Sequence, residues 1–186
     1  MPYEPPPELA ALSLDEVAGL VAARKLPPVD QWSPAKTGHS EMRIAADGRW
    51  FHQEGEIRRP AMVRAFASLL TCDPDGQHWL VTPTQKLAIA VEDAAFIAID
   101  VKQEGDALIF RLNTDDLVIA GPDHPIVAAG DPETPALYVA VRHGTRARLN
   151  RSTYAQLVEI ALTGMLPEGE APAATSKGAR FSLVPA

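Results

Sequence analysis

The chain has 186 residues, of which 46% are hydrophobic and 22% charged, and this composition is ordinary for a globular protein. Its formal net charge of −7 argues against a protein that binds nucleic acid over its whole surface, because phosphate contacts require an excess of lysine and arginine. No apolar run approaches the length of a membrane span, the N-terminus lacks the regions of a secretory signal, and the single cysteine, Cys72, excludes an internal disulfide. These features predict a cytoplasmic protein with no membrane partner, and they argue against nucleic acid as its main partner.

The first predicted elements are a proline-rich arm over residues 1–8 and a helix that begins after Ser13. Ser13 can cap this helix, and Glu16 follows three residues later, as a capping box requires. Pro27 and Pro28 end any helical continuation. Residues 29–40 then read as a loop that leads to the first hairpin.

Two segments about ninety residues apart share a pattern of two strands, an arginine and an amphipathic helix. The first covers residues 42–70 with its arginine at Arg59, and the second covers residues 137–162 with its arginine at Arg151. With the two arginines aligned, the apolar stripes of the following helices coincide, whereas the hairpins match only loosely. The pattern indicates a duplicated strand-strand-helix motif, although unrelated units of this kind can share it by physics alone.

Between these segments the chain is rich in strands, and it predicts an α+β fold. Seven candidate strands cover residues 79–82, 87–91, 96–102, 107–112, 117–120, 137–142 and 145–149, with a long loop over residues 121–135 and a closing helix over residues 153–163. We therefore expect two β-rich halves, residues 1–76 and 77–166, of which the second is superficially similar to a pleckstrin-homology fold, a bent sheet capped by a C-terminal helix. The tail, residues 167–186, has few large apolar side chains and is expected to be surface-bound or mobile.

One basic island stands out in this acidic chain. Residues 138–158 contain no acidic residue, and they include Arg142, Arg146, Arg148, Arg151 and His143. A hairpin rich in basic residues, as predicted here, is most often simply a solvent-exposed surface. The alternatives are an anion site, which suits the planar fork of arginine, or a surface for protein or nucleic-acid partners.

Residues 80–94 resist a purely structural interpretation. Leu87, Ile89 and Val91 alternate as one buried face, which places Lys86 and Glu92 on the opposite face. Six strand residues separate these two charges by roughly 20 Å, so each needs a partner from another segment. Arginines of the repeated hairpins are the expected partners for Glu92, and residues 92–94 are expected to form a bend or bulge.

The sequence contains no catalytic, cofactor or metal signature. The five histidines lack metal-ligand spacing, and neither a phosphate-binding loop nor a nucleophile elbow occurs. We therefore assign no catalytic residue, no metal ligand and no cofactor, and the balance favours a protein without enzymatic activity.

Residues 41–51, 55–59, 80–86 and 91–96 together resemble the signature blocks of a proteobacterial family known as domain of unknown function 1285. The resemblance covers roughly residues 27–162 and implies a duplicated core with a ligand pocket between the halves, suspected to take a nucleotide-like molecule in signal transduction. The chain departs from the family pattern at Gln85, usually a glutamate, and at Ala95, usually a proline. The resemblance therefore assigns a site role to Lys86 more securely than to Gln85.

Our leading hypothesis is a non-enzymatic module that binds a small anionic, nucleotide-like ligand where the halves meet. Arg43, Arg59 and Lys86 would neutralise its phosphate, Trp50 would stack on a base, and Glu92 or Asp93 would orient those cations or accept a hydrogen bond from the ligand. Two alternatives stay open: a phosphoester hydrolase in which Glu92 and Asp93 hold a divalent ion, and a protein-interaction module whose charges form a purely structural network. The ligand, the pathway and the oligomeric state cannot be read from the sequence.

Overall fold

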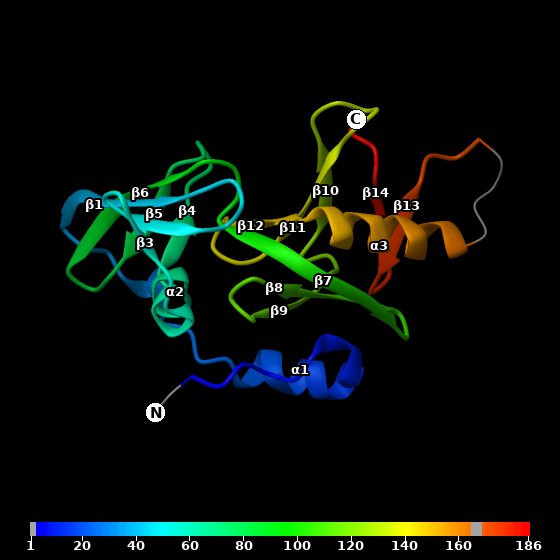
Figure 1. Cartoon of the computed structure of the whole chain (residues 1–186), viewed down its shortest axis with the longest axis horizontal. Coiled ribbons are helices and arrows are strands. Elements are labelled where there is room, and N and C mark those ends of the chain that lie inside the picture. Colours follow the sequence, from blue (N-terminus) through cyan, green and yellow to red (C-terminus); the bar gives the residue numbers. More distant parts are fainter. Residues whose placement is uncertain (1–2, 165–168) are drawn as a thin grey trace. The chain divides into compact units, whose positions relative to one another are not determined.

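The computed structural model describes residues 3–164 and 169–186, and the chain divides into two units that each contain one six-stranded sheet (Figure 1). The first unit comprises Met1–Pro5, Lys25–Phe96 and Val141–Arg146, and the second comprises Pro6–Arg24, Ile97–Ala140 and Ala147–Ala186. The α+β class, the two β-rich halves and the helix near the C-terminus are thereby confirmed. Among the described residues, no helix has the length and hydrophobicity that crossing a bilayer requires.

The first sheet has the strand order β3-β2-β1-β6-β5-β4. Its strands are β1 (Lys36–Ile44), β2 (Trp50–His52), β3 (Gly55–Ile57), β4 (Leu70–Cys72), β5 (His78–Val81) and β6 (Gln85–Val91). Neighbours are antiparallel except β1 and β6, which run parallel at the centre of the sheet. A bulge between His39 and Arg43 interrupts β1, and Glu41 there adopts a positive φ of 58°.

The core of the first unit lies between this sheet and α2 (Pro60–Ala67). Trp50 is 1% exposed and its ring stacks on Phe66 of α2, with 6.4 Å between the ring centroids. Ile44, which is directly opposite Trp50 in the sheet, is fully buried. One face of the sheet is therefore covered by α2, and the other is the face on which Arg43 and Phe51 lie.

The segment Val141–Arg146 completes the first unit with a tight turn at His143 and Gly144. The His143 carbonyl accepts a hydrogen bond of 2.9 Å from the backbone N–H of Cys72 in β4. The Arg142 guanidinium lies over the Phe96 ring, 5.1 Å from its centroid, and donates to the Ala67 carbonyl at 3.4 Å. Part of the basic island is thus used in packing.

The second sheet has the order β10-β11-β12-β7-β8-β9. Its strands are β7 (Phe96–Glu104), β8 (Ala107–Leu112), β9 (Leu117–Ile119), β10 (Ile126–Ala129), β11 (Ala136–Ala140) and β12 (Arg146–Leu149). β8 is deeply buried, since only Arg111 among its residues is not fully buried. This strand is therefore covered on both faces.

The N-terminal part of the second unit contains η1 (Leu9–Ala11) and α1 (Leu14–Ala23), whereas η2 (Val29–Gln31) belongs to the first unit. The predicted capping box is confirmed, because the Ser13 hydroxyl accepts from the Glu16 N–H at 3.1 Å and the Glu16 carboxylate accepts from the Ser13 N–H at 3.5 Å. Of the apolar residues Leu14, Val17, Ala18 and Val21 of α1, only Val17 is fully buried.

The C-terminal part of the second unit contains α3 (Arg151–Thr163), which is capped by Asn150, and a hairpin of β13 (Ala173–Ser176) and β14 (Ala179–Ser182). The hydroxyl of Ser176 is fully buried; it accepts from the Leu108 N–H at 2.8 Å and donates to the Ala120 carbonyl at 2.7 Å. These bonds fasten the hairpin to β8 and to the residue that follows β9.

The structure differs from the sequence-based expectations in four places. β5 and β6 lie in the first sheet, so the division comes after Phe96 instead of after residue 76, and the second sheet has six strands instead of seven. The expected loop 121–135 contains β10, because this strand pairs with β11. The helix expected to reach residue 70 ends at Ala67, since residues 70–72 form β4. Where it is described, the tail forms the β13–β14 hairpin, while residues 167–168 lie outside the described part.

Candidate functional site

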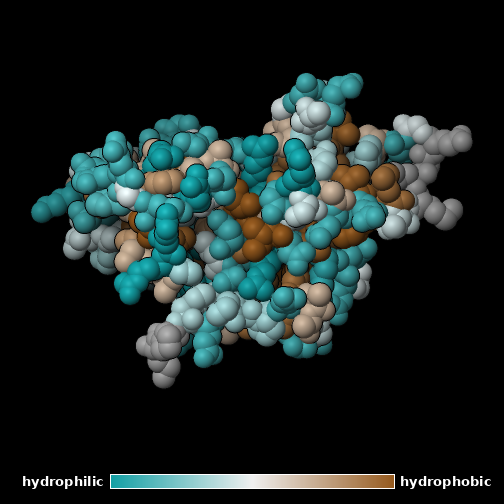
Figure 2. All heavy atoms as spheres, in the orientation of Figure 1, coloured by the Kyte–Doolittle hydropathy of each residue, from teal (hydrophilic) through white to brown (hydrophobic). Residues whose placement is uncertain are grey.

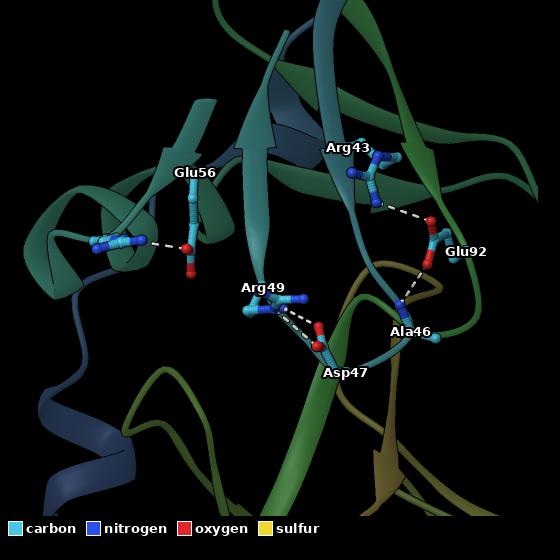
Figure 3. A network of polar contacts seen from close by, with 7 residues as sticks. Arg43, Ala46, Asp47, Arg49, Glu56 and Glu92 are labelled. Carbon is cyan, nitrogen blue, oxygen red and sulfur yellow. Dashed lines mark hydrogen bonds and ion pairs between the residues drawn. The ribbon is translucent and has the colours of Figure 1, made fainter. Parts of the chain in front are cut away.

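The clearest polar contact among the predicted site residues joins Arg43 of β1 to Glu92. Arg43 Nη1 lies 2.8 Å from Glu92 Oε1, and Glu92 Oε2 accepts a bond of 2.8 Å from the backbone N–H of Ala46 (Figure 3). Glu92 lies at the bend that directly follows β6. The expectation that an arginine of the first hairpin segment pairs with Glu92 is confirmed.

The Arg43 guanidinium also lies over an aromatic ring. Its Cζ is 4.4 Å from the centroid of Phe51, the residue directly opposite Arg43 in β2. A second guanidinium, that of Arg49, is 5.5 Å from the same centroid. Phe51 is half-buried, and 40% of the Arg43 side chain and 58% of the Arg49 side chain are exposed. Two accessible cations therefore share one aromatic ring on the face of the sheet opposite α2.

Arg49 is held in place by Asp47, two residues earlier in the turn between β1 and β2. Arg49 Nε lies 2.8 Å from Asp47 Oδ2, and the Arg49 backbone N–H donates to Asp47 Oδ1 at 3.1 Å (Figure 3). This backbone bond is the main cause that lowers the pKa of Asp47 below its ordinary value of 3.8. Asp47 is therefore ionised at neutral pH, and each of the two arginines has its own carboxylate. We call Arg43, Asp47, Arg49, Phe51 and Glu92 the arginine–phenylalanine site.

Lys86 belongs to a different cluster at the beginning of β6. Its Nζ lies 3.8 Å from Asp73 Oδ2 and 4.4 Å from the ring centroid of Trp79, whose Nε1 donates to the same carboxylate oxygen at 2.8 Å. Ala90, the β6 residue opposite Arg43, is four residues further along, roughly 13 Å away. The expected convergence of Arg43, Lys86 and Glu92 on one site is not what the structure shows.

Three other predicted site residues lie elsewhere. The expected stacking of Trp50 on a ligand base conflicts with its position in the core, because its ring is 1% exposed and covered by Phe66. Arg59 is exposed at the N-cap of α2, and its side chain makes no ion pair with any described residue. Asp93 is half-buried in the bend that follows β6 and has polar interactions of its own.

Sequence reasoning missed Phe51 and Arg49 in favour of Trp50. The alternation of β2 places residues 50 and 51 on opposite faces, so one of the two aromatic rings had to face α2. Which one does so depends on the pairing of Trp50 with the buried Ile44, and this register is not visible in β2 alone.

The hydrolase alternative required Glu92 and Asp93 to hold a divalent ion. Within the described part of the chain, no group of three or more His, Cys, Asp or Glu side chains is placed to hold a metal ion. Both carboxylate oxygens of Glu92 are already engaged, one by Arg43 and one by the Ala46 N–H. A divalent ion at Glu92 would lie close to the Arg43 guanidinium, whose positive charge opposes the binding of a second cation.

Surface hydropathy is consistent with a polar site. Figure 2 shows mostly hydrophilic residues over the visible face of the first unit.

Cys72 in β4 is half-buried, and burial is the main cause that raises the pKa of its thiol. This environment disfavours the reactive thiolate, so we do not include Cys72 in the site.

Comparison with known proteins places the chain in a family. The model for the N-terminal domain of DUF1285, a domain of unknown function, matches residues 27–94, and the model for its C-terminal domain matches residues 95–183. No match was found among curated proteins.

Two solved structures are similar to this chain. The crystal structure of a DUF1285 family protein from Silicibacter pomeroyi DSS-3 is 38% identical, with a TM-score of 0.77 over 94% of this chain and 96% of that chain. A DUF1285 family protein from Shewanella baltica OS155 is 23% identical, with a TM-score of 0.53 over 63% of this chain and 90% of that chain, and it supports the fold alone. Because the family models cover most of its length, the chain belongs to the DUF1285 family.

Proposed function

We propose that the first unit is a non-enzymatic module that binds a small anionic ligand with an aromatic ring, such as a nucleotide, at the arginine–phenylalanine site. The observation that carries this proposal is the placement of two exposed guanidinium groups, Arg43 and Arg49, over the one half-buried ring of Phe51. Guanidinium groups bind phosphate through paired hydrogen bonds, and an aromatic or guanidinium plane can support a base by stacking. In this proposal Phe51, and not Trp50, is the aromatic residue that stacks on the base of the ligand.

The two carboxylates of the site orient these cations without exhausting their donors. A guanidinium has five N–H groups, and Glu92 accepts from one terminal nitrogen of Arg43 while Asp47 accepts from Nε of Arg49. The remaining N–H groups are available to an anion. Holding a long side chain in a fixed position before binding also reduces the entropy that binding would otherwise cost.

The structural-network alternative interprets the same charges as an element of stability only. Glu92 is 46% exposed and Arg43 is 40% exposed, and exposed ion pairs contribute about 0–1 kcal/mol. So small a contribution does not by itself account for two cations placed over one ring. A role in signal transduction, which the family resemblance implies, remains a prediction.

The test measures ligand binding by thermal shift and calorimetry on the full chain, with AMP, GMP and ATP as probes and inorganic phosphate and adenosine as partial probes. A ligand that binds only the folded state raises the melting temperature, so at least one nucleotide should raise that of the parent protein. Arg49→Ala should weaken binding of that nucleotide by about tenfold, because it removes a charged hydrogen-bond donor. Phe51→Leu should weaken it by less.

Arg180 provides the matched control. It is 57% exposed and is paired with Glu170 at 2.8 Å, as Arg49 is 58% exposed and is paired with Asp47 at 2.8 Å, but it lies on β14 in the second unit. Arg180→Ala should therefore bind the nucleotide like the parent. The proposal is refuted if no probe shifts the melting temperature, or if Arg49→Ala and Arg180→Ala bind alike. Loss of stability in Arg43→Ala together with no probe binding would favour the structural network.

A further inference from the structure

The N-terminal segment Pro6–Arg24, which we call the strap, lies against one face of the second sheet. The register of β7, β8 and β9 defines this face. Lys102, Ile109 and Ile119 are direct neighbours across the three strands, and Arg111 pairs with Leu117 in the adjacent row. Directly opposite residues point to the same side, so these five side chains form one surface, which we call the β8–β9 face.

The apolar part of the contact comes from a few strap side chains. Leu9, Leu12 and Val17 are 1%, 5% and 0% exposed and form one buried cluster with Ile109. The half-buried residues packed against this cluster are Leu14 of the strap and Leu117 and Ile119 of the β8–β9 face. In Figure 1, α1 lies beside β9, as these contacts require.

The polar part of the contact consists of hydrogen bonds from cations of the β8–β9 face to backbone carbonyls of the strap. Arg111 donates through Nη1 to the Pro7 carbonyl at 3.0 Å and through Nη2 to the Pro6 carbonyl at 3.4 Å. Lys102 Nζ donates to the Leu12 carbonyl. Every peptide has carbonyl oxygens, so these two cations can hold a segment of matching shape whether or not it belongs to the same chain.

The strap has the properties of a ligand more than those of a core element. The family models begin at residue 27 and therefore describe the β8–β9 face without the strap. Its helix has its own capping box at Ser13, and most of α1 is exposed, including Leu20 at 39% and Val21 at 41%. Besides the hydrogen bonds from Arg111 and Lys102, the strap is held by the ion pair of its last residue, Arg24, with Asp116 at 2.8 Å and by three buried apolar side chains. These contacts must offset the ordering of the whole segment, and such opposing terms are of similar size.

We infer that the β8–β9 face is a peptide-binding surface, that the strap fills it within the chain, and that a free peptide with the pattern of the strap can take its place. The matching peptide carries two leucines three residues apart, followed by a capped helix with an inward valine, as Leu9, Leu12 and Val17 do. A tethered strap competes at a high effective concentration, so a free peptide binds well only when the strap is weakened or released.

The experiment uses a fluorescently labelled synthetic peptide of residues 6–24 and the full chain, and it measures binding by fluorescence anisotropy. Leu9→Asp with Leu12→Asp in the chain weakens the internal strap, so this variant should bind the wild-type peptide at least about tenfold more tightly than the parent does. The peptide should also raise the melting temperature of this variant.

Two controls separate binding at the β8–β9 face from other effects. Leu20→Asp with Val21→Asp changes two exposed apolar residues of the same strap and should leave peptide binding at the parental level. Adding Arg111→Ala to the Leu9→Asp/Leu12→Asp variant removes a donor to the Pro6 and Pro7 carbonyls and should weaken peptide binding by about tenfold.

Each outcome decides the inference. Tight peptide binding by Leu9→Asp/Leu12→Asp that is reduced by Arg111→Ala supports it. If this variant has no cooperative thermal transition, with or without the peptide, then the strap is part of the core and the inference is overturned. It is equally overturned if the variant folds but does not bind the peptide, or if Arg111→Ala leaves binding unchanged.

Discussion

The two sheets use cations beside apolar side chains in different ways. On the first sheet, Arg43 and Arg49 lie over Phe51, and their partners are exposed carboxylates. On the second sheet, Lys102 and Arg111 lie beside Ile109; each is paired with a carboxylate, Glu104 or Asp115, and each also donates to carbonyls of the strap. The exposed fractions differ accordingly, at 40% for Arg43 against 13% for Arg111.

This difference separates a surface that the chain has already filled from one that it has left accessible. Where a cation donates to carbonyls of its own chain, its binding capacity is used within the fold. Where it is paired only with a carboxylate at the surface, most of its donors still face water. The arginine–phenylalanine site is therefore the better candidate for a small ligand, and the β8–β9 face is the better candidate for a peptide.

The largest expected effect compares two turns of the same type in the two units. Gly144 and Gly178 both have φ of 80°, after His143 and Lys177, which also have positive φ. A Cβ on Gly144 would lie 2.2 Å from the Cys72 carbonyl oxygen, whereas a Cβ on Gly178 would meet nothing within 4 Å. Gly144→Ala should lower the free energy of unfolding by about 4 kcal/mol, and Gly178→Ala by about 1 kcal/mol.

Urea denaturation followed by circular dichroism measures both changes. Equal losses in the two variants would contradict the contact between the turn and β4.

The second prediction asks whether the C-terminal hairpin is part of the second unit. Ser176→Ala removes the buried hydroxyl that bridges the Leu108 N–H and the Ala120 carbonyl, and it should cost about 2 kcal/mol of unfolding free energy. Ser182→Ala on the same hairpin removes an exposed hydroxyl and should cost less than about 0.5 kcal/mol. Denaturation midpoints that are the same for both variants would mean that the hairpin does not stabilise the sheet.

The third prediction compares one ion pair from each unit. Arg24 Nε and Asp116 Oδ1 lie 2.8 Å apart with Asp116 at 4% side-chain exposure, while the equally short pair of Arg43 and Glu92 is exposed. Asp116→Ala should cost about 1.5 kcal/mol, because it also removes the acceptor of the Thr114 hydroxyl, and Glu92→Ala should cost at most about 0.5 kcal/mol. A larger loss in Glu92→Ala than in Asp116→Ala, measured by thermal and chemical denaturation, would reverse the comparison.

The smallest expected effect is a pH dependence in the first unit. Burial is the main cause that lowers the pKa of His78 in β5 below its ordinary value of 6.5. The folded state then binds fewer protons at this site than the unfolded state in the window below pH 6.5, so the free energy of unfolding should rise with pH through that window. The contribution vanishes above it, where both states are neutral.

An NMR titration of the His78 ring checks this directly, and His78→Gln should reduce the slope of stability against pH. A ring that titrates at or above 6.5 in the folded protein would contradict the burial of His78 in the sheet.

The sequence was most informative where the signal is local. The capping box at Ser13 and Glu16 depends on residues three positions apart, and the structure confirms it. Alternation along β6 placed Lys86 and Glu92 on one face, and distance along the strand showed that they could not pair with each other. The need of Glu92 for an arginine partner followed from these two facts, and Arg43 is that partner.

The features that depend on pairing between distant segments, such as which strands share a sheet, could not be predicted from local patterns. β1 and β6 are parallel neighbours although His39 and Ala88 are far apart in sequence, and this pairing brings β5 and β6 into the first sheet. A parallel pair has no short connecting turn that would reveal it in the sequence. The boundary between the two halves was therefore predicted too early, after residue 76. β10 and the β13–β14 hairpin are short elements, and their contacts come from β11 and from the Ser176 hydroxyl.

By itself, then, the sequence determined the fold class, the family resemblance and the capped first helix. It also determined that Lys86 and Glu92 lie on the side opposite the apolar residues Leu87, Ile89 and Val91. Only the tertiary structure decided which aromatic ring of β2 is buried, that Lys86 lies apart from Arg43, and that the strap covers the β8–β9 face. The physical reason is the same in each case. Local periodicity sets which residues share a face, whereas the element that covers that face comes from another part of the chain.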